Sequence, residues 1–406
     1  MKNHIDLHIH RKFGSIIGVQ YPRPLNNEKK SKCRNILWNL YVYIPCATMF
    51  VELLSQTVQI VLSIENIEIL TTCTLSTIYV LQLIFKLMVF KKNENLFQDI
   101  FDETIGISID LKNNPLADDT FIEFYNKHYS LIKKITIYKG IIQLSSNLGL
   151  HAIFCTLSWI GMKRDSTAAF SWTPYDSSKN PEYTYTVLFE TFCYGFVTAR
   201  GAVVDFLFLI MIVVPAIQLN YLKYLLKLIF QEQTQEILNS KLQWWIKQHQ
   251  RILKNMKDFN KISSPFLSVI YIGSLIDLFM AGFVAISSSH WDIFQRIMIN
   301  GIIIIDALQL YLFSLAGDWL RESSGEIPDL GLSTALFDSN RKIKRNYLYI
   351  QIRAQRQIIL KFAGVNNLST QTFLRLIKLT FTYFITTLQI RQSRLEQLNN
   401  SKKYIP

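Results

Sequence analysis

The last apolar stretch of the chain, residues 372–389, reads TFLRLIKLTFTYFITTLQ. A helix of about 20 residues crosses the roughly 30 Å hydrocarbon core of a bilayer, and this stretch has nearly that length. On a helical wheel at about 100° per residue, its polar side chains gather within about 60° of one line. Apolar side chains take the opposite side, among them Phe373, Leu376, Ile377, Phe384 and Leu388. The polar line consists of Gln371, Arg375, Lys378, Thr382, Thr386 and Gln389.

Polar groups that face lipid are costly, so the polar line of a membrane helix faces protein or water. One interpretation is a pore, in which several copies of the helix surround an axis and this line forms the lining. The other is a helix whose polar groups only hydrogen-bond to neighbouring helices. The wheel by itself leaves both interpretations open.

Six further apolar stretches precede this one in a chain of 406 residues that is 50% hydrophobic. Backbone polar groups inside a bilayer are satisfied only within helices or closed barrels, and these stretches have the length of helices. The sequence therefore predicts an all-α membrane protein with seven transmembrane helices. The first six are expected at about residues 36–62, 68–90, 137–162, 186–219, 263–286 and 293–315.

The distribution of Lys and Arg predicts the orientation of these helices. The segment before the first helix and the connection at 223–261 are basic, whereas the connections at 63–66 and 287–291 have no Lys or Arg. The positive-inside rule then places the N-terminus in the cytoplasm, and seven spans place the C-terminus outside the cell. The expected parts are a cytoplasmic segment 1–35, six helices within 36–330, a cytoplasmic helix within 331–367, a pore helix at 368–390 and an extracellular tail 391–406.

Two segments keep the helical period but are too charged to cross a membrane. Residues 219–263 read as a cytoplasmic extension of the fourth and fifth helices. Residues 341–362 read as a cytoplasmic helix that leads into the last span through a turn at Gly364-Val365-Asn366-Asn367. Helices that protrude together in this way are expected to pack subunits against one another as an anchor.

Several other classes of protein are disfavoured. The net charge of +13 comes from basic residues that flank the apolar spans, so no nucleic-acid-binding patch is expected. The five cysteines have no CxxC or His spacing, and no metal site or cofactor is predicted. No nucleophile–base arrangement is recognisable, so an enzyme is not expected. Ionisable residues inside the spans are candidates for a functional role, but pairing or packing within the bundle is the favoured interpretation for Glu190, Arg200, Asp205, Asp277 and Asp306.

The outer halves of the second, third, fourth and sixth spans contain many aromatic residues. An apolar cavity with few hydrogen-bonding groups suits a small lipophilic ligand, although ordinary helix packing explains the same residues. The aromatic and neighbouring residues in question are Tyr79, His151, Phe154, Trp159, Phe189, Phe192, Tyr194 and Phe196.

The order of several short motifs is similar to the C-terminal signature of the insect odorant receptors. These motifs are Ala354-Gln355-Arg356, Ala363-Gly364, Leu368-Ser369, Thr372-Phe373 and Thr382-Tyr383-Phe384. The loop from Trp172-Thr173-Pro174-Tyr175-Asp176 to Pro181-Glu182-Tyr183 also resembles that family. Further matching positions are Asp205, His249, Gly317-Asp318 and Glu322-Ser323, so the resemblance covers most of the chain.

This resemblance implies a tetrameric, ligand-gated, non-selective cation channel whose last helix lines one central pore. Aligned on Thr382-Tyr383-Phe384, the gate positions of the family fall on Thr386 and Gln389. Arg375 and Lys378 lie on the same line and would hinder cations if they were repeated four times. We therefore expect an odorant-selective subunit that assembles with the olfactory co-receptor as a heterotetramer. A gustatory receptor-type channel and, less favoured, an inverted-topology metabotropic receptor remain as alternatives.

The resemblance also implies a site for a volatile, hydrophobic odorant and a cellular location. The expected location is the plasma membrane of olfactory sensory neuron dendrites, surrounded by lipid. Asn399-Asn400-Ser401 is a glycosylation sequon on the expected outer side, with Asn399 as the acceptor. The residues chosen for the odorant site by depth and chemistry are Tyr79, Phe154, Trp159, Phe189, Phe192, Ile305 and Gln309.

Overall fold

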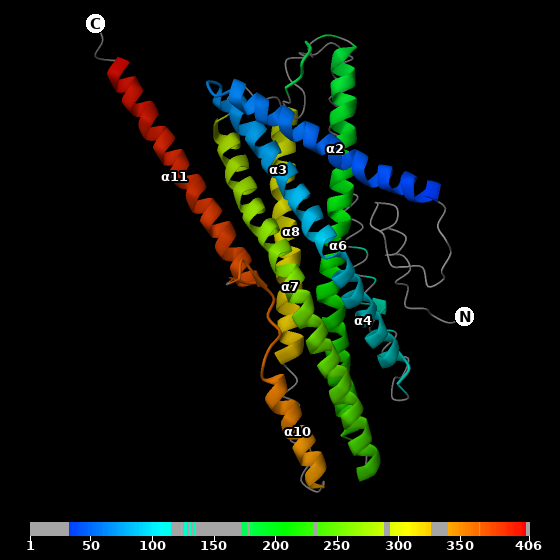
Figure 1. Cartoon of the computed structure of the whole chain (residues 1–406). Coiled ribbons are helices and arrows are strands. Elements are labelled where there is room, and N and C mark those ends of the chain that lie inside the picture. Colours follow the sequence, from blue (N-terminus) through cyan, green and yellow to red (C-terminus); the bar gives the residue numbers. More distant parts are fainter. Residues whose placement is uncertain are drawn as a thin grey trace.

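A computed structural model describes residues 32–114, 172–176, 181–230, 234–287, 293–325, 340–364 and 366–402, and a few isolated positions between 115 and 180. This part of the chain is an elongated bundle of helices (Figure 1). The elements in chain order are α2 Lys32–Leu62, α3 Ile67–Lys92, α4 Glu94–Lys112, α6 Glu182–Ile229, α7 Gln235–Ser287, α8 Ile293–Gly325, α10 Arg341–Ala354, β1 Lys361–Phe362, β2 Asn366–Asn367 and α11 Thr370–Lys402.

The predicted class, a helical membrane protein, is confirmed. Four helices in the described residues are long and apolar enough to cross a membrane, within Ile69–Lys92, Arg200–Ile229, Gln235–Phe283 and Ile303–Gly325. The expected first helix corresponds to α2, of which Ala47–Leu62 is a shorter apolar part. The expected third span, 137–162, lies outside the described residues, as do residues 1–31.

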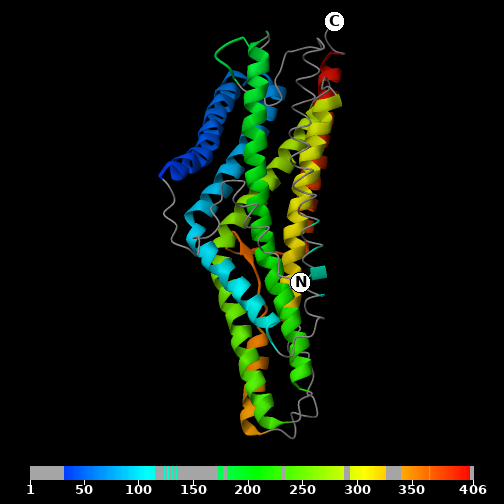
Figure 2. The ribbon, with the colours of Figure 1, turned by 90° about the vertical axis from the view of Figure 1, so that its right-hand side faces the viewer.

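The long helices continue past the expected membrane boundary, as the periodicity of residues 219–263 predicts. α6 runs on to Ile229, and α7 begins at Gln235 and has 53 residues, which corresponds to about 80 Å. Their lower parts pack with α4 and α10 (Figures 1 and 2). The core there includes the fully buried Trp245, whose indole nitrogen donates to the Leu222 carbonyl at 2.7 Å.

One helix in this lower part was missed by the sequence analysis. The connection after α3 contains α4, which buries Phe97, Phe101 and Leu111 on one side. The spacing of these residues is helical and would have revealed an amphipathic helix. Arg251 of α7 holds α4 through ion pairs with Glu103, at 2.7 Å, and with Asp110.

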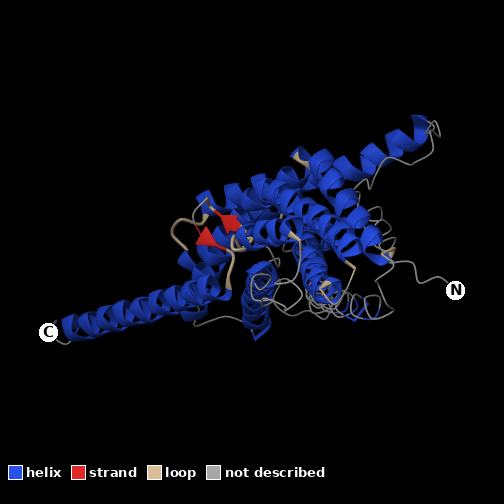
Figure 3. Ribbon diagram, turned by 90° about the horizontal axis from the view of Figure 1, so that it is seen from below, coloured by secondary structure: helices blue, strands red, loops and turns tan. Residues whose placement is uncertain are grey.

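The expected helix 341–362 is wrong in its second half, because α10 ends at Ala354. The following residues form an antiparallel hairpin, β1 with β2, which Figure 3 shows among the helices. Side chains of α7 accept its backbone N–H groups: Asn260 from Lys361 at 3.2 Å and Ser268 from Ala363 at 2.6 Å. These tertiary hydrogen bonds replace those that a continued helix would have made.

The hairpin turns at Ala363-Gly364, one residue before the expected start of the turn, and the expected turn residues Asn366 and Asn367 form β2 instead. Gly364 has a φ of +72°, in the left-handed region that glycine adopts without strain. The hairpin is fixed to α7 because Phe362 stacks on Tyr271 with 4.1 Å between ring centroids. It therefore forms a short, rigid link between α10 and α11.

The last helix is longer than the sequence analysis expects. α11 does not end near Gln389 but continues to Lys402, so it has 33 residues and is about 50 Å long. That length exceeds the roughly 30 Å hydrocarbon core of a bilayer. Asn399, the predicted glycosylation acceptor, therefore lies within a helix and not in an irregular tail.

Candidate functional site

The last helix, α11, touches the rest of the bundle along one side only. Figures 1 and 3 show it at the edge of the molecule, diverging from the other helices toward the C-terminus. It packs against α7 and α8. The side chains that are half-buried on this side recur every three or four residues and include Phe373, Leu376, Ile377, Thr380, Phe384 and Thr387.

The predicted polar line lies on the opposite side of α11. Arg375, Lys378, Thr382, Thr386 and Gln389 are all exposed in the single chain. The hydroxyl of Thr382 donates to the Lys378 carbonyl and that of Thr386 to the Thr382 carbonyl, both at 2.9 Å. Each hydroxyl still has lone pairs that water or an ion can use. The polar line therefore does not contribute to the packing of this chain against itself.

Exposed apolar side chains flank the polar line on both sides. The register of the helix places Leu374, Phe381 and Ile385 along one flank, and Leu379 and Tyr383 along the other. A helix buried in one subunit would cover such residues. An arrangement of one polar line between two apolar flanks suits a helix whose neighbours on both sides are copies of the same kind of helix.

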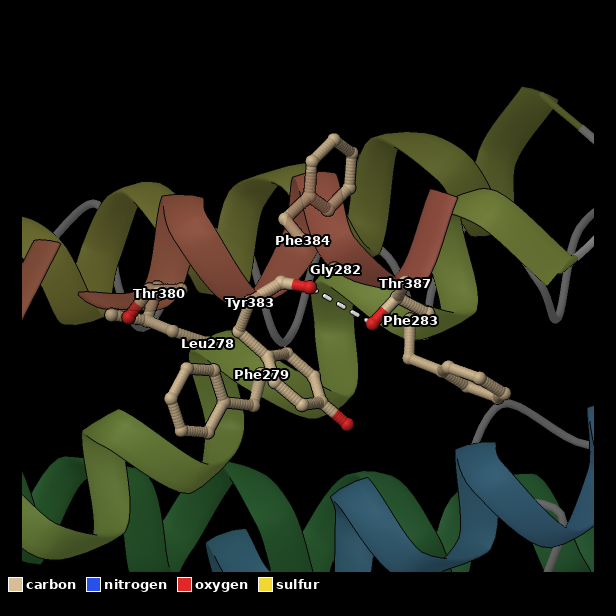
Figure 4. A pocket seen from close by; sticks show the side chains of 8 residues that line it. All are labelled: Leu278, Phe279, Gly282, Phe283, Thr380, Tyr383, Phe384 and Thr387. Atoms are coloured by element: carbon tan, nitrogen blue, oxygen red, sulfur yellow. Dashed lines mark hydrogen bonds between the residues drawn. The ribbon is translucent and has the colours of Figure 1, made fainter. Parts of the chain in front are cut away.

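The contact between α11 and α7 is aromatic and close. Phe279 and Tyr383 have ring centroids 4.8 Å apart. A Cβ atom at Gly282 would lie 3.1 Å from Phe384, so glycine permits this approach. Figure 4 shows the small pocket that these residues leave, in which the Thr387 hydroxyl donates to the Tyr383 carbonyl at 2.9 Å. Leu278, Phe279, Gly282, Phe283, Thr380, Tyr383, Phe384 and Thr387 line it.

The N-terminus of α11 is fastened to α8. The Asp318 carboxylate accepts from the Thr370 backbone N–H at 2.7 Å and from the Thr370 hydroxyl at 2.5 Å. A carboxylate at a helix N-terminus satisfies a free N–H group and interacts favourably with the helix dipole. Gly317 beside it lets the Leu368 backbone approach α8. The motif Gly317-Asp318 is therefore the docking point of the last helix.

This docking point leads to a testable prediction. In Gly317→Ala, the new Cβ would lie 2.5 Å from the Leu368 carbonyl oxygen, a backbone atom, so α8 and α11 must separate. We expect a loss of about 1–3 kcal/mol in the free energy of unfolding, as for other overpacked contacts. Thermal unfolding in detergent measures this loss.

The matched control for this prediction is Gly301→Ala on the same helix. A Cβ at Gly301 meets no atom within 4 Å, and alanine favours a helix by about 1 kcal/mol over glycine. This control is expected to be as stable as the original chain or slightly more stable. Equal unfolding temperatures for the two variants would show that Gly317 is not a tight contact.

Buried polar residues link α3 to α6 and to α7 in the interior of the bundle. Lys86 of α3 pairs with Asp205 of α6 at 3.3 Å. Gln82 of α3 donates to Asp277 of α7, and Asp306 of α8 lies within electrostatic range of Asp277. The predicted pairing within the bundle is thus found for Asp205, whose partner Lys86 was not foreseen. We interpret the Lys86–Asp205 and Gln82–Asp277 pairs as structural connections between the helices.

The structure places the predicted odorant-site residues on three helices. Tyr79 lies on α3, where it is partly buried beside a small cluster that includes Met49 and Leu83. Phe189 and Phe192 are exposed on α6, and Ile305 and the buried Gln309 lie on α8. The other two, Phe154 and Trp159, lie outside the described residues. The odorant site therefore stays a prediction.

A protein-family model described as 7tm Odorant receptor matches residues 59–381, well over half of the chain. The chain belongs to the insect odorant receptor family. The predicted resemblance is thereby confirmed, and members of this family are receptors and not enzymes.

Two insect odorant receptors are similar over part of their sequences. The chain is 24% identical over 140 residues to Odorant receptor 49a of Drosophila melanogaster and 22% identical over 147 residues to Odorant receptor Or2 of Anopheles gambiae. These alignments cover 34% and 36% of this chain. The chain thus matches only about a third of the length of each relative, 35% and 38%.

Solved structures of an insect olfactory receptor share the fold over nearly the whole chain. The OR5 receptor from Machilis hrabei in complex with eugenol superposes with a TM-score of 0.81 at 15% identity, covering 94% of this chain and 98% of that one. A second solved structure of the OR5 receptor superposes with a TM-score of 0.79 at 17% identity, covering 95% of this chain and 100% of that one. At such low identity, the likeness establishes the odorant receptor fold alone.

Proposed function

We propose that this odorant receptor is the ligand-selective subunit of a heteromeric, odorant-gated, non-selective cation channel in which α11 lines the pore. In this proposal seven helices cross the plasma membrane of olfactory sensory neuron dendrites, with the N-terminus inside and the C-terminus outside. A volatile, hydrophobic odorant binds in the outer half of the bundle and opens the pore. Asn399 is then on the outer side, where it is available for glycosylation.

The observation that carries this proposal is the orientation of α11. Its polar line faces away from its own bundle and lies between two exposed apolar flanks. If that side faced lipid, burying the charge of Arg375 or of Lys378 at the bilayer centre would cost about 3 kcal/mol each. A long side chain near the membrane surface reduces this cost by extending its charged end into water. A ring of subunits removes the cost, because the flanks pack on neighbouring subunits and the line faces water.

The charge on the polar line supports a heteromer. Four identical copies would place four Arg375 and four Lys378 side chains around one pore, which disfavours cations. A partner with neutral residues at these positions lowers that charge, and we propose that the olfactory co-receptor supplies it. On this proposal, co-expression with the co-receptor gives odorant-evoked currents and this chain alone gives little.

For the odorant site, the residues proposed remain Tyr79, Phe154, Trp159, Phe189, Phe192, Ile305 and Gln309. Support comes from the chemistry of these residues and from the fold shared with a receptor described in complex with eugenol, a small aromatic molecule. Binding in such an apolar site gains roughly 25 cal/mol per Å² of buried apolar surface. The site would therefore discriminate mainly by ligand shape.

Substitution of two residues on the polar line tests the pore. Thr386→Ala and Gln389→Ala in the co-expressed channel are expected to change the Ca²⁺-to-Na⁺ permeability ratio by about twofold or more, because each removes a group that can contact a passing ion. The ranking of odorants should stay the same, because both residues lie on the side of α11 away from the bundle. Reversal potentials in whole-cell recordings measure the ratio.

The matched control is Thr380→Ala. The Thr380 hydroxyl makes the same kind of hydrogen bond as Thr386, to the Leu376 carbonyl at 3.0 Å, but Thr380 lies on the side of α11 that faces the bundle. The permeability ratio of Thr380→Ala is expected to equal that of the original channel. If both test variants also kept the original ratio, the polar line would not line the pore and the proposed function would lose its support.

A further inference from the structure

Two unneutralised cations lie close together on the polar line of α11. Arg375 and Lys378 are both exposed and are three residues apart, so about 4.5 Å of helix axis separates them. Residues 370–390 contain no Asp or Glu. Neither cation has an ion-pair partner in the part of the chain that the structure describes, whereas Lys86, Lys91, Arg251 and Lys261 are all paired there.

The position of these charges along α11 is asymmetric. Arg375 and Lys378 follow the N-terminal residue Thr370 by five and eight residues, or roughly 8 and 12 Å along the helix axis. That end of α11 follows the hairpin and Asp318, toward the expected cytoplasmic side. Thr386 and Gln389 lie roughly 12 and 16 Å farther than Lys378. The charges therefore lie near one end of the polar line, and its outer half is neutral.

We infer that Arg375 and Lys378 form an electrostatic barrier at the cytoplasmic end of the pore, whose height depends on how many copies of this chain the channel contains. The inference rests on the proposed pore function of α11 and adds a rule for ion flow. Positive charge at the inner end depletes cations arriving from the cytosol more than it affects those at the outer end. The channel then passes inward current more readily than outward current.

The size of the effect follows from Coulomb's law and screening. A unit charge about 6 Å from the path of a monovalent ion in water changes the local ion concentration about threefold. For a divalent cation the local concentration changes by about the square of that factor, because its charge is twice as large. The Debye length is about 10 Å at 0.1 M salt and about 3 Å at 1 M, so high salt removes most of the barrier. Rectification and a low Ca²⁺ permeability are thus expected together.

The experiment uses inside-out patches that contain this chain and the olfactory co-receptor in symmetrical Na⁺ solutions. Lys378→Gln is expected to raise the ratio of outward to inward current about twofold to threefold and to raise the Ca²⁺-to-Na⁺ permeability ratio. Lys378→Arg keeps the charge and should restore the original ratios. Lys92→Gln, at the exposed cytoplasmic end of α3 and away from α11, is the matched control and should change neither ratio.

A second measurement keeps the inference testable even if Lys378→Gln fails to assemble. In the original channel, raising the symmetrical salt concentration from about 0.1 M to 1 M should make the current–voltage relation nearly linear. Rectification that persists at high salt, or that is unchanged in Lys378→Gln, overturns the barrier. If Thr386→Ala and Gln389→Ala still alter permeation in that case, only this inference fails and the pore function stands.

Discussion

Replacement of Lys86 by methionine is expected to destabilise the folded receptor by about 3–5 kcal/mol. The side chains of Lys86 and Asp205 are only 6% and 3% exposed, and they pair at 3.3 Å between α3 and α6. Methionine keeps most of the volume but removes the ammonium group that pairs with the buried Asp205 carboxylate. The measurement is the unfolding temperature of the detergent-solubilised receptor, or its yield as a monodisperse species.

The control for this prediction removes both partners at once. Lys86→Met with Asp205→Leu removes the buried carboxylate together with the ammonium group that pairs with it, so most of the lost stability should return. A double variant as unstable as Lys86→Met alone would indicate that the ion pair has another role, such as contact with the nearby Gln82–Asp277 hydrogen bond. A stable single variant would contradict the burial that the structure shows.

The second large effect is a loss of stability in mild acid that depends on His249. This residue lies on the lower part of α7, stacked on Trp245 with 4.9 Å between ring centroids. Burial, with Arg353 of α10 as a smaller contribution, lowers the pKa of His249 from 6.5 to about 4. The folded chain therefore holds the imidazole neutral, whereas the unfolded chain protonates it near pH 6.5.

The sign and the pH window follow from this difference. The stability that His249 contributes is fully present above about pH 6.5 and is lost as the pH falls toward 4. The complete loss is about 3 kcal/mol. Scanning fluorimetry at pH 7.5, 6, 5 and 4 measures the course of unfolding. Carboxylates also titrate in this range, so the relevant quantity is the difference from a His249 variant.

His249→Phe is the appropriate variant, because it keeps an aromatic ring against Trp245 but has no proton to bind. Between pH 6.5 and 4, the free energy of unfolding of His249→Phe should fall by about 3 kcal/mol less than that of the original chain. Parallel pH profiles for the two proteins would show that His249 is accessible or is already charged in the folded receptor.

Much of the fold follows from local sequence patterns. Apolar stretches of membrane length predict α3, α6, α8 and the upper part of α7, and continued periodicity predicts the lower parts of α6 and α7. These features are local, because helical hydrogen bonds join residues only four apart. The amphipathic α4 has the same kind of local signal in the helical spacing of Phe97, Phe101 and Leu111.

The hairpin between α10 and α11 could not be predicted in the same way. Residues 355–362 keep a helical apolar period, yet Asn260, Ser268 and Ser324 from distant parts of the chain take up the backbone N–H groups of this segment. No local pattern reveals such partners. The same holds for Lys86, whose role as the partner of Asp205 depends on the approach of α3 to α6.

The sequence by itself determined which residues of α11 share one line, because the geometry of a helix fixes that relation among neighbours. Only the tertiary structure decided which way the line faces. Asp318 and Gly317 fix the start of α11 on α8, and Phe279 and Gly282 fix its course along α7. These contacts join residues far apart in the chain and turn Arg375, Lys378, Thr382, Thr386 and Gln389 outward, because the apolar side of α11 gains more by burial against the bundle.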